Sequence, residues 1–112
     1  MSYSKKDLIN FRINKAKETF QDAKLLLDAE RWDSAANRLY YASFYMISAY
    51  LAKREIKVTT HSGLKTKFNQ ELVKTGKIEK DLGIAFNKLV AMRQEYDYEY
   101  SRVIKEVEVD AM

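Results

Sequence analysis

Near the end of the chain, the segment RQEYDYEY (residues 93–100) combines an arginine, three acidic residues and three tyrosines. Successive residues of a helix turn by about 100°, so Arg93, Asp97 and Tyr100 would share one stripe, while Tyr98 would point away from it. In such a segment the arginine can contact phosphate and the tyrosines can stack on bases. The same residues could also be the remains of a catalytic site. The alternative is a surface pair of Arg93 and Asp97, beside tyrosines that cover the core and keep their hydroxyls in water.

A second group of candidate residues lies in NRLYYASFY, where Arg38 is followed at helical spacing by Tyr41 and Tyr45, with Asn37 beside it. Arg38 is the one charged residue in the run ANRLYYASFYMISAYLA. A buried charge without a partner is costly, so this arginine must be paired. One interpretation is stacking on aromatic rings with a carboxylate from a later helix as partner. The other is that Arg38 and a row of tyrosines line a groove for an anionic ligand.

His61, in TTHSGL, is the only histidine of the chain. An imidazole at a helix start can take part in acid–base chemistry near neutral pH, although a single histidine is more often structural or exposed. With one histidine and no cysteine in the chain, we expect neither a histidine cluster nor a cysteine site for a metal. We also expect no cofactor. Ser62 lacks the setting of a serine nucleophile, and the three glycines lie too far apart for a phosphate loop.

The composition bounds the class of protein. With 112 residues, the chain has the length of one domain, and we predict a single domain over residues 1–112. The net charge of +4 arises from mixed charges, which permits an anionic partner without requiring one. No run is apolar enough to cross a membrane and no signal-peptide core is present, so we expect no membrane association and a cytoplasmic location.

The apolar pattern and the absence of proline predict an all-α fold. Ser4, with Asp7 three residues later, is expected to cap a helix running to about Glu30. Asp33 is expected to cap a second helix, over residues 34–54, whose apolar residues on nearly all faces would make it central or part of a second interface. The apolar stripe predicted on the first helix consists of Leu8, Phe11, Ala16, Phe20, Ala23 and Leu27.

Later elements are shorter. We predict a loop over residues 55–60, then a short third helix that Thr59 or Thr60 caps and Gly76 ends. A fourth helix would start near Ile78 and include RQEYDYEY. The buried residues expected in these two helices are Leu64, Phe68, Leu72, Leu82, Phe86, Leu89 and Val90. The expected architecture is an antiparallel up-and-down bundle of four to five helices, in which residues 101–112 extend the fourth helix or form a fifth.

Four motifs of the sequence, and the order in which they follow one another, resemble the HEPN family, in particular its small stand-alone bacterial and archaeal members. They are AANRLYYASFY, then THSGL followed by a phenylalanine, then VKTG, then an arginine with DY a few residues on. The resemblance covers roughly residues 20–98. It implies a helical bundle that forms a homodimer. Many members of this family are metal-independent RNases, others pair with a minimal nucleotidyltransferase in toxin–antitoxin systems, and others bind nucleotides or RNA.

The resemblance also implies roles for single residues. Arg93 matches the signature arginine, but Tyr98 stands where the RNases have a histidine, and Tyr100 matches a trailing tyrosine that some partners modify. A tyrosine that titrates near 10 is a poor base at neutral pH. Within the resembling subgroup an aspartate–tyrosine pair is usual here, so Arg93, Asp97 and Tyr98 are the expected catalytic-type site. Relatives usually continue into a longer last helix than this chain has.

The resemblance also implies that residues of the second helix line a groove together with Arg93. Two subunits would form this groove and share the site. The candidate RNA- or nucleotide-binding residues are Asn37, Arg38, Tyr41, His61 and Tyr100. The first hypothesis is a HEPN-like dimer that binds RNA or a nucleotide with little or no catalysis, alongside a nucleotidyltransferase. The second is an endoribonuclease toxin that uses Arg93 with Asp97, Tyr98 or His61. The third is a helical interaction module without a role in nucleic-acid binding.

Overall fold

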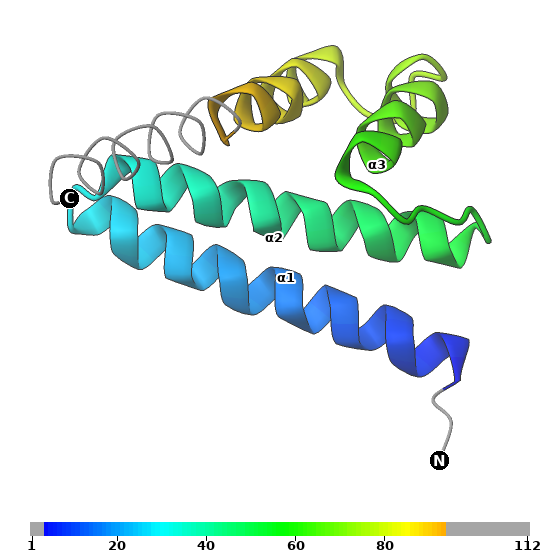
Figure 1. Cartoon of the computed structure of the whole chain (residues 1–112), viewed down its shortest axis with the longest axis horizontal. Coiled ribbons are helices and arrows are strands. Elements are labelled where there is room, and N and C mark those ends of the chain that lie inside the picture. The colour runs from blue at the N-terminus through cyan, green and yellow to red at the C-terminus, as the bar shows by residue number, and fades with distance from the viewer. Residues whose placement is uncertain (1–3, 94–112) are drawn as a thin grey trace, which may run out of the picture.

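The computed structural model describes residues 4–93, and every regular element in that range is a helix. The long helices α1 (Lys5–Asp28) and α2 (Trp32–Lys53) run antiparallel, side by side (Figure 1). The helix α3 (His61–Phe68) leads directly into the π-helical turn η1 (Asn69–Val73). A last helix occupies residues 80–93. The predicted all-α helical bundle is therefore confirmed, while Asp97, Tyr98, Tyr100 and residues 101–112 lie outside the described residues.

The start of α1 follows the sequence prediction. The Ser4 hydroxyl oxygen accepts a hydrogen bond from the Asp7 backbone N–H at 3.1 Å. In return, the Asp7 carboxylate accepts one from the Ser4 backbone N–H at 3.3 Å. These reciprocal bonds satisfy two N–H groups that the first turn of a helix otherwise leaves without partners.

The corner between α1 and α2 is tighter than predicted. At the end of α1, Glu30 adopts a left-handed backbone with φ of 59°. The N–H of Arg31 then reaches the Leu26 carbonyl at 2.9 Å, which closes the turn typical of helix C-termini. As a result, α2 begins at Trp32 with Arg31 as its N-cap. The prediction that Asp33 caps α2 was wrong, because Asp33 lies inside the first turn. Its negative charge there still interacts favourably with the positive end of the helix dipole.

Small side chains form the contact between α1 and α2. The buried residues are Ala16, Thr19 and Ala23 on α1, and Ala35, Ala42 and Ala49 among those on α2. A spacing of seven residues keeps such positions on one stripe, and the short side chains let the two helix axes approach closely. The larger members of the stripe predicted on α1 are exposed instead: Leu8, Phe11, Phe20 and Leu27.

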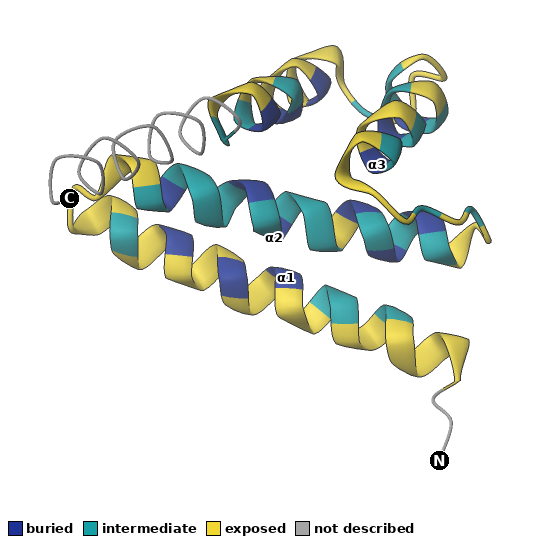
Figure 2. Cartoon of the chain, in the orientation of Figure 1, coloured by how far each residue is buried: buried dark blue, intermediate teal, exposed yellow. Residues whose placement is uncertain are grey.

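The hydrophobic core lies on the side of α2 that faces α3 and the last helix. Figure 2 shows buried positions on all three of these elements. α2 is thus covered on two sides, which explains its apolar sequence and confirms its predicted central place. The predicted residues Leu64, Phe68 and Leu72 are all buried, whereas Leu82 is exposed. The core consists of Tyr40, Ile47, Leu51, Leu64, Phe68, Leu72, Phe86 and Val90.

Residues 54–60 and 74–79 form the turns and irregular segments that flank α3 and η1. The Thr60 hydroxyl accepts a hydrogen bond from the Gly63 N–H at 2.9 Å, so the predicted cap of α3 is confirmed. Gly76, with φ of 72°, provides the left-handed residue after η1. The last helix begins at residue 80, two residues after the expected start at Ile78.

Two close contacts fix the last helix on η1. The side-chain amides of Asn69 and Asn87 exchange hydrogen bonds at 3.0 and 3.3 Å. A Cβ added at Gly83 would stand 2.9 Å from a methyl group of Val73, so this position needs glycine for the close approach. These contacts set the register of the helix that carries Arg93.

None of the helices in the described part of the chain combines the length and the apolar run that crossing a bilayer requires.

Candidate functional site

Arg93, near the end of the described chain, reaches back to α2. Its Nη2 atom donates a hydrogen bond to the Tyr41 hydroxyl at 2.9 Å. The central carbon of the guanidinium stands 5.1 Å from the ring centre of Tyr40 and 5.3 Å from that of Tyr41. Cation–π attraction and a hydrogen bond therefore act together on this arginine. The half-buried side chain is held at a defined place against α2.

Arg38 approaches the same tyrosine from within α2. Its guanidinium carbon lies 5.1 Å from the ring centre of Tyr41. Its Nε and Nη2 atoms donate to the Asn37 side-chain oxygen at 3.2 and 2.7 Å. The stacking on an aromatic ring is as predicted. Among the described residues, however, the hydrogen-bond partner is an amide oxygen rather than a carboxylate, so this bond leaves the positive charge un-neutralised.

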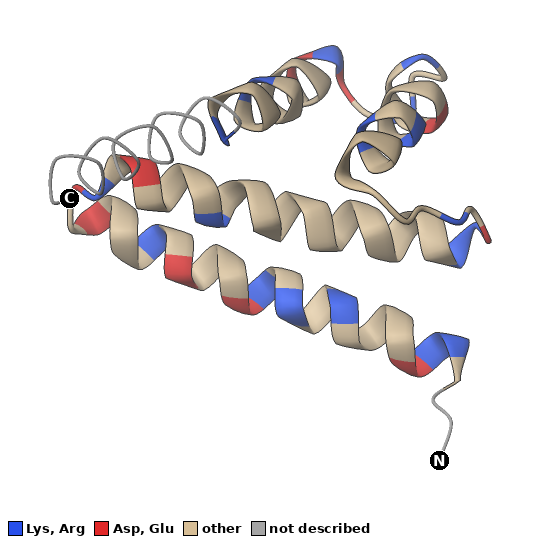
Figure 3. Cartoon of the chain, in the orientation of Figure 1, with Lys and Arg blue, Asp and Glu red and all other residues tan. Residues whose placement is uncertain are grey.

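Tyr41 thus joins two positively charged side chains that are far apart in the sequence. One subunit alone brings Asn37, Arg38, Tyr41 and Arg93 together. Arg38 is isolated from other charges of α2, because the sequence has no other charged residue between Asp33 and Lys53. Figure 3 shows the middle of α2 mostly in the colour of uncharged residues. A surface hollow of about 420 Å³ borders Arg38 and Asn37, with Leu26 and Ser34 as its other walls. An anion would have access to Arg38 from that side.

His61 joins the cluster through Tyr40, a residue that the sequence interpretation did not single out. The Tyr40 hydroxyl and the Nδ1 atom of His61 are 2.6 Å apart. The imidazole stacks on the Phe44 ring, with 4.4 Å between centres and 25° between planes. Its centre is 6.0 Å from that of Tyr41. Although His61 is exposed, its ring is therefore held by three aromatic side chains of α2.

The electrostatic environment shifts both members of this pair away from their charged forms. Burial, and then the positive charge of Arg93, lower the pKa of His61. Burial raises the pKa of Tyr40, with a contribution from Tyr41, while Arg93 acts in the opposite direction. At neutral pH the imidazole and the phenol are hence both uncharged, and Arg93 and Arg38 carry the positive charge of the site.

The sequence held one weak signal for Tyr40. The doublet Tyr40–Tyr41 faces two directions on a helix, so one tyrosine points to the core and the other to its edge. The spacing of Arg38, Tyr41 and Tyr45 drew attention to the edge only. The contact between Tyr40 and His61 spans 21 positions, and no local pattern predicts such a pair.

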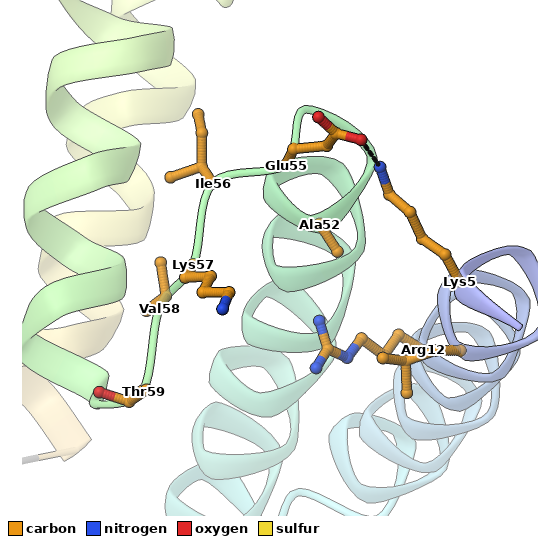
Figure 4. A pocket seen from close by; sticks show the side chains of 9 residues that line it. Lys5, Arg12, Ala52, Glu55, Ile56, Lys57, Val58 and Thr59 are labelled. Carbon is orange, nitrogen blue, oxygen red and sulfur yellow. Dashed lines mark hydrogen bonds and ion pairs between the residues drawn. The ribbon is translucent and has the colours of Figure 1, made fainter. Parts of the chain in front are cut away.

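A separate cleft of about 370 Å³ lies between the start of α1, the end of α2 and the loop that follows, as the close-up in Figure 4 shows. Lys5, Arg12 and Lys57 line it together with Glu55. Lys5 forms an ion pair with Glu55 at 3.0 Å. Cations at the end of α2 also complement its dipole, so this cleft has a structural explanation and shares no lining residue with the site around Tyr41.

Among residues 4–93, no group of three or more histidine, cysteine, aspartate or glutamate side chains is placed to hold a metal ion. The described part of the site itself offers two guanidinium groups, tyrosine hydroxyls and one imidazole. Guanidinium groups favour phosphate oxygens, and aromatic rings favour bases.

Comparison with known proteins assigns the chain to a family. The family model of the HEPN domain matches residues 9–112, which include α2, α3 and the segment that follows Arg93. The chain belongs to the HEPN family. This confirms the family and the all-α fold that the four sequence motifs implied.

Relatives support the assignment. A UPF0332 protein of Thermotoga maritima is 45% identical over 94 residues, which are 84% of this chain and 71% of the relative. The protein named putative toxin MJ0142, from Methanocaldococcus jannaschii, is 33% identical over 98 residues, or 88% of this chain and 67% of the relative. A second protein of that organism, named putative toxin MJ0605, is 30% identical, with 74% of this chain and 62% of the relative covered. No solved structure matches the chain at a significant level.

Proposed function

We propose that this HEPN protein binds the phosphate groups of RNA or of a nucleotide at the site around Tyr41. The single observation that carries the proposal is the meeting of Arg38 and Arg93 on one tyrosine ring. Two guanidinium groups beside the half-buried ring of Tyr41 suit a phosphate and an adjoining base. Asn37 and His61 border the same cluster. In this proposal Asp97, Tyr98 and Tyr100, which follow Arg93 in the chain, complete the site.

Placing two like charges on one ring is itself an argument for a ligand. Both guanidinium groups are positively charged, and the Asn37 amide supplies no negative charge to offset Arg38. A phosphate bound beside Arg38 would supply that charge, so the arrangement favours an anion there.

A binding assay tests this function. The affinity of the protein for a short single-stranded RNA would be measured over a range of salt concentrations, for wild type, Arg38→Ala and Arg93→Ala. Each arginine variant should bind about tenfold more weakly, because a charge-assisted hydrogen bond is lost. The salt dependence should also become shallower, since fewer counterions are released.

Lys15→Ala is the matched control. Lys15 is exposed on α1, so this variant loses one positive charge away from the cluster around Tyr41. It should bind like the wild type. Equal losses in all three variants would mean that only net charge matters. Absent or salt-independent binding would instead favour a helical interaction module without a role in RNA binding.

An endoribonuclease is the second candidate function. The observation in its favour is that His61, the only histidine of the chain, lies in the same aromatic cluster as Arg93. An imidazole near a phosphate-binding arginine can move protons during attack by a ribose 2′-hydroxyl. Cleavage of RNA by wild type in the presence of a chelator, and its loss in Arg93→Ala, would establish this activity. Cleavage that is unchanged in Arg93→Ala would be attributed to contamination.

The protein is further proposed to form a homodimer. Large apolar side chains are exposed on α1 and at the start of α2, including Phe11, Leu25 and Trp32, which are 66%, 68% and 62% exposed. Exposed apolar surface of this kind favours association. Light scattering of the eluting protein should give twice the monomer mass. A monomer at all concentrations tested would rule out this part of the proposal.

A minimal nucleotidyltransferase is the proposed protein partner, in a toxin–antitoxin-type pair. The support is the family together with the relatives named as putative toxins. Co-expression with a nucleotidyltransferase encoded beside the gene, followed by purification through a tag on one of the two proteins, should recover both in fixed ratio. Recovery of the tagged protein alone would exclude a stable pair.

A further inference from the structure

We propose that the Tyr40–His61 pair couples phosphate binding to proton uptake at His61, with Tyr40 as the residue that positions the imidazole. The inference rests on the proposed function, because it assigns a regulation to the same site. It begins from the shortest side-chain contact around the site, the 2.6 Å between the Tyr40 hydroxyl and Nδ1 of His61.

Tyr40 fixes which nitrogen of the imidazole is free. Its side chain is only 2% exposed, and its phenol is uncharged at neutral pH because burial raises the pKa of Tyr40. A neutral phenol donates its proton to an imidazole nitrogen more readily than it accepts one. Tyr40 therefore donates to Nδ1, and the ring proton of His61 resides on Nε2. Among the described residues, Tyr40 is the hydrogen-bond partner of this ring. Because His61 is exposed, Nε2–H faces solvent in the free protein and is accessible to a ligand.

The free site resists a second proton on the imidazole. A charged imidazole would have to donate from Nδ1, and the buried Tyr40 hydroxyl would lose its acceptor. The groups that face His61 add to this resistance: Arg93 from the last helix is positively charged, and Tyr40, Tyr41 and Phe44 from α2 are uncharged. Within α3, Lys65 follows one turn later on the same side of the helix.

A phosphate bound by Arg93 would reverse this balance. Its negative charge offsets the guanidinium that disfavours a charged imidazole, and protonated His61 would donate to a phosphate oxygen from Nε2. The pKa of His61 must then be higher in the complex than in the free protein. By linkage, affinity rises as pH falls through the interval between the two pKa values, by no more than about tenfold per pH unit for one proton.

The single histidine makes the test direct. In protein without a histidine tag, nuclear magnetic resonance of the imidazole nitrogens reports the tautomer and the pKa of His61 alone. The ligand probe is a short 2′-O-methyl RNA without terminal phosphates. It cannot be cleaved by 2′-hydroxyl attack, and its phosphodiesters do not titrate near neutral pH. We expect the Nε2–H tautomer in the free protein, and a pKa of His61 that is below the ordinary value of about 6.5 and rises when the probe binds.

Tyr40→Phe tests the positioning role. It keeps the ring in the core but removes the hydroxyl that stabilises the neutral imidazole. The pKa of His61 should therefore rise in the free variant, the bias toward the Nε2–H tautomer should fade, and the pH dependence of binding should weaken. Tyr50→Phe is the matched control, because its hydroxyl accepts from Arg54 and does not touch His61. It should leave all three readouts unchanged.

The outcomes separate the two proposals. Binding of the probe with an unchanged pKa of His61, or an Nδ1–H tautomer in the free wild type, overturns the coupling and leaves phosphate binding standing. A Tyr40→Phe variant that behaves like the wild type removes the positioning role. No binding of the probe at any pH overturns the coupling and the proposed function together. Binding about threefold or more stronger at pH 6 than at pH 7.5, lost in His61→Gln, is the expected result.

Discussion

The Arg93 guanidinium donates a hydrogen bond to the Tyr41 hydroxyl at 2.9 Å, across 52 positions of the chain. Because Arg38 stands over the same ring, Tyr41 is the residue through which α2 and the last helix bring two cations together. The geometry of the site therefore depends on the last helix as much as on α2.

Tyr41→Phe should loosen Arg93 while leaving the aromatic ring for both cations. Loss of one hydrogen bond to a charged group should lower the free energy of unfolding by about 1 kcal/mol. RNA affinity should fall several-fold, less than in Arg93→Ala, because the guanidinium remains but is no longer oriented. Urea denaturation and the RNA-binding assay measure the two effects. An RNA affinity as low as that of Arg93→Ala would show that orientation, rather than charge, dominates.

Gly83→Ala should disturb the packing of the last helix against η1. The added Cβ would stand 2.9 Å from a methyl group of Val73, whose branched side chain is stiff. We expect a net loss of roughly 1–2 kcal/mol in the free energy of unfolding, although alanine favours helices over glycine. Val73→Ala and the double variant complete a thermodynamic cycle. A purely additive cycle would show that these two residues do not press on each other.

Glu30→Gly should stabilise the corner between α1 and α2. Glu30 holds a left-handed backbone with φ of 59°, a conformation that costs a residue with a side chain about 1 kcal/mol. Glycine should therefore raise the free energy of unfolding by roughly 0.5 kcal/mol, after its greater freedom in the unfolded chain is counted.

The converse change is Gly76→Ala. At Gly76, φ is 72° and an added Cβ meets nothing within 4 Å, so only backbone strain is introduced. It should destabilise the protein by about 1 kcal/mol. Thermal denaturation compares both variants with the wild type, and shifts of the same sign would contradict the argument from backbone conformation.

The stability of the protein should depend on pH through His61. Its pKa is lower in the folded protein than the ordinary value of about 6.5, because of burial and Arg93. Between these two pKa values the unfolded chain binds more protons than the folded one, so the free energy of unfolding rises with pH in that interval and falls as pH drops. The difference between wild type and His61→Gln isolates this contribution. A flat difference across the interval would contradict it.

Several local features could be predicted because they depend on residues a few positions apart. Ser4 and Asp7 cap each other within one turn. Thr60 caps α3 by accepting a hydrogen bond from the Gly63 N–H, three residues later. The spacing of Leu64 and Phe68 correctly indicated the buried face of α3. Hydrogen bonds and packing along one helix turn follow directly from neighbouring residue types.

The helix that Asp33 was expected to cap shows the limit of such patterns. Asp33 has the right side chain for an N-cap, yet the closing turn of α1 at Glu30 places the N-cap of α2 at Arg31, two residues before Asp33. Likewise, of the apolar stripe predicted on α1, Ala16 and Ala23 are buried, whereas Phe11 and Phe20 are exposed. The choice depends on the partner helix, which a single helix pattern does not contain.

By itself, the sequence determined that the chain is helical and a member of the HEPN family, and it supplied the candidate residues of the proposed site. It did so because helix periodicity and motif order are properties of consecutive residues. Only the tertiary structure decided that Arg93 meets Arg38 on Tyr41, and that His61 is held by Tyr40. These contacts depend on the relative register of separate helices, which core packing around Phe86 and the close approach at Gly83 set together.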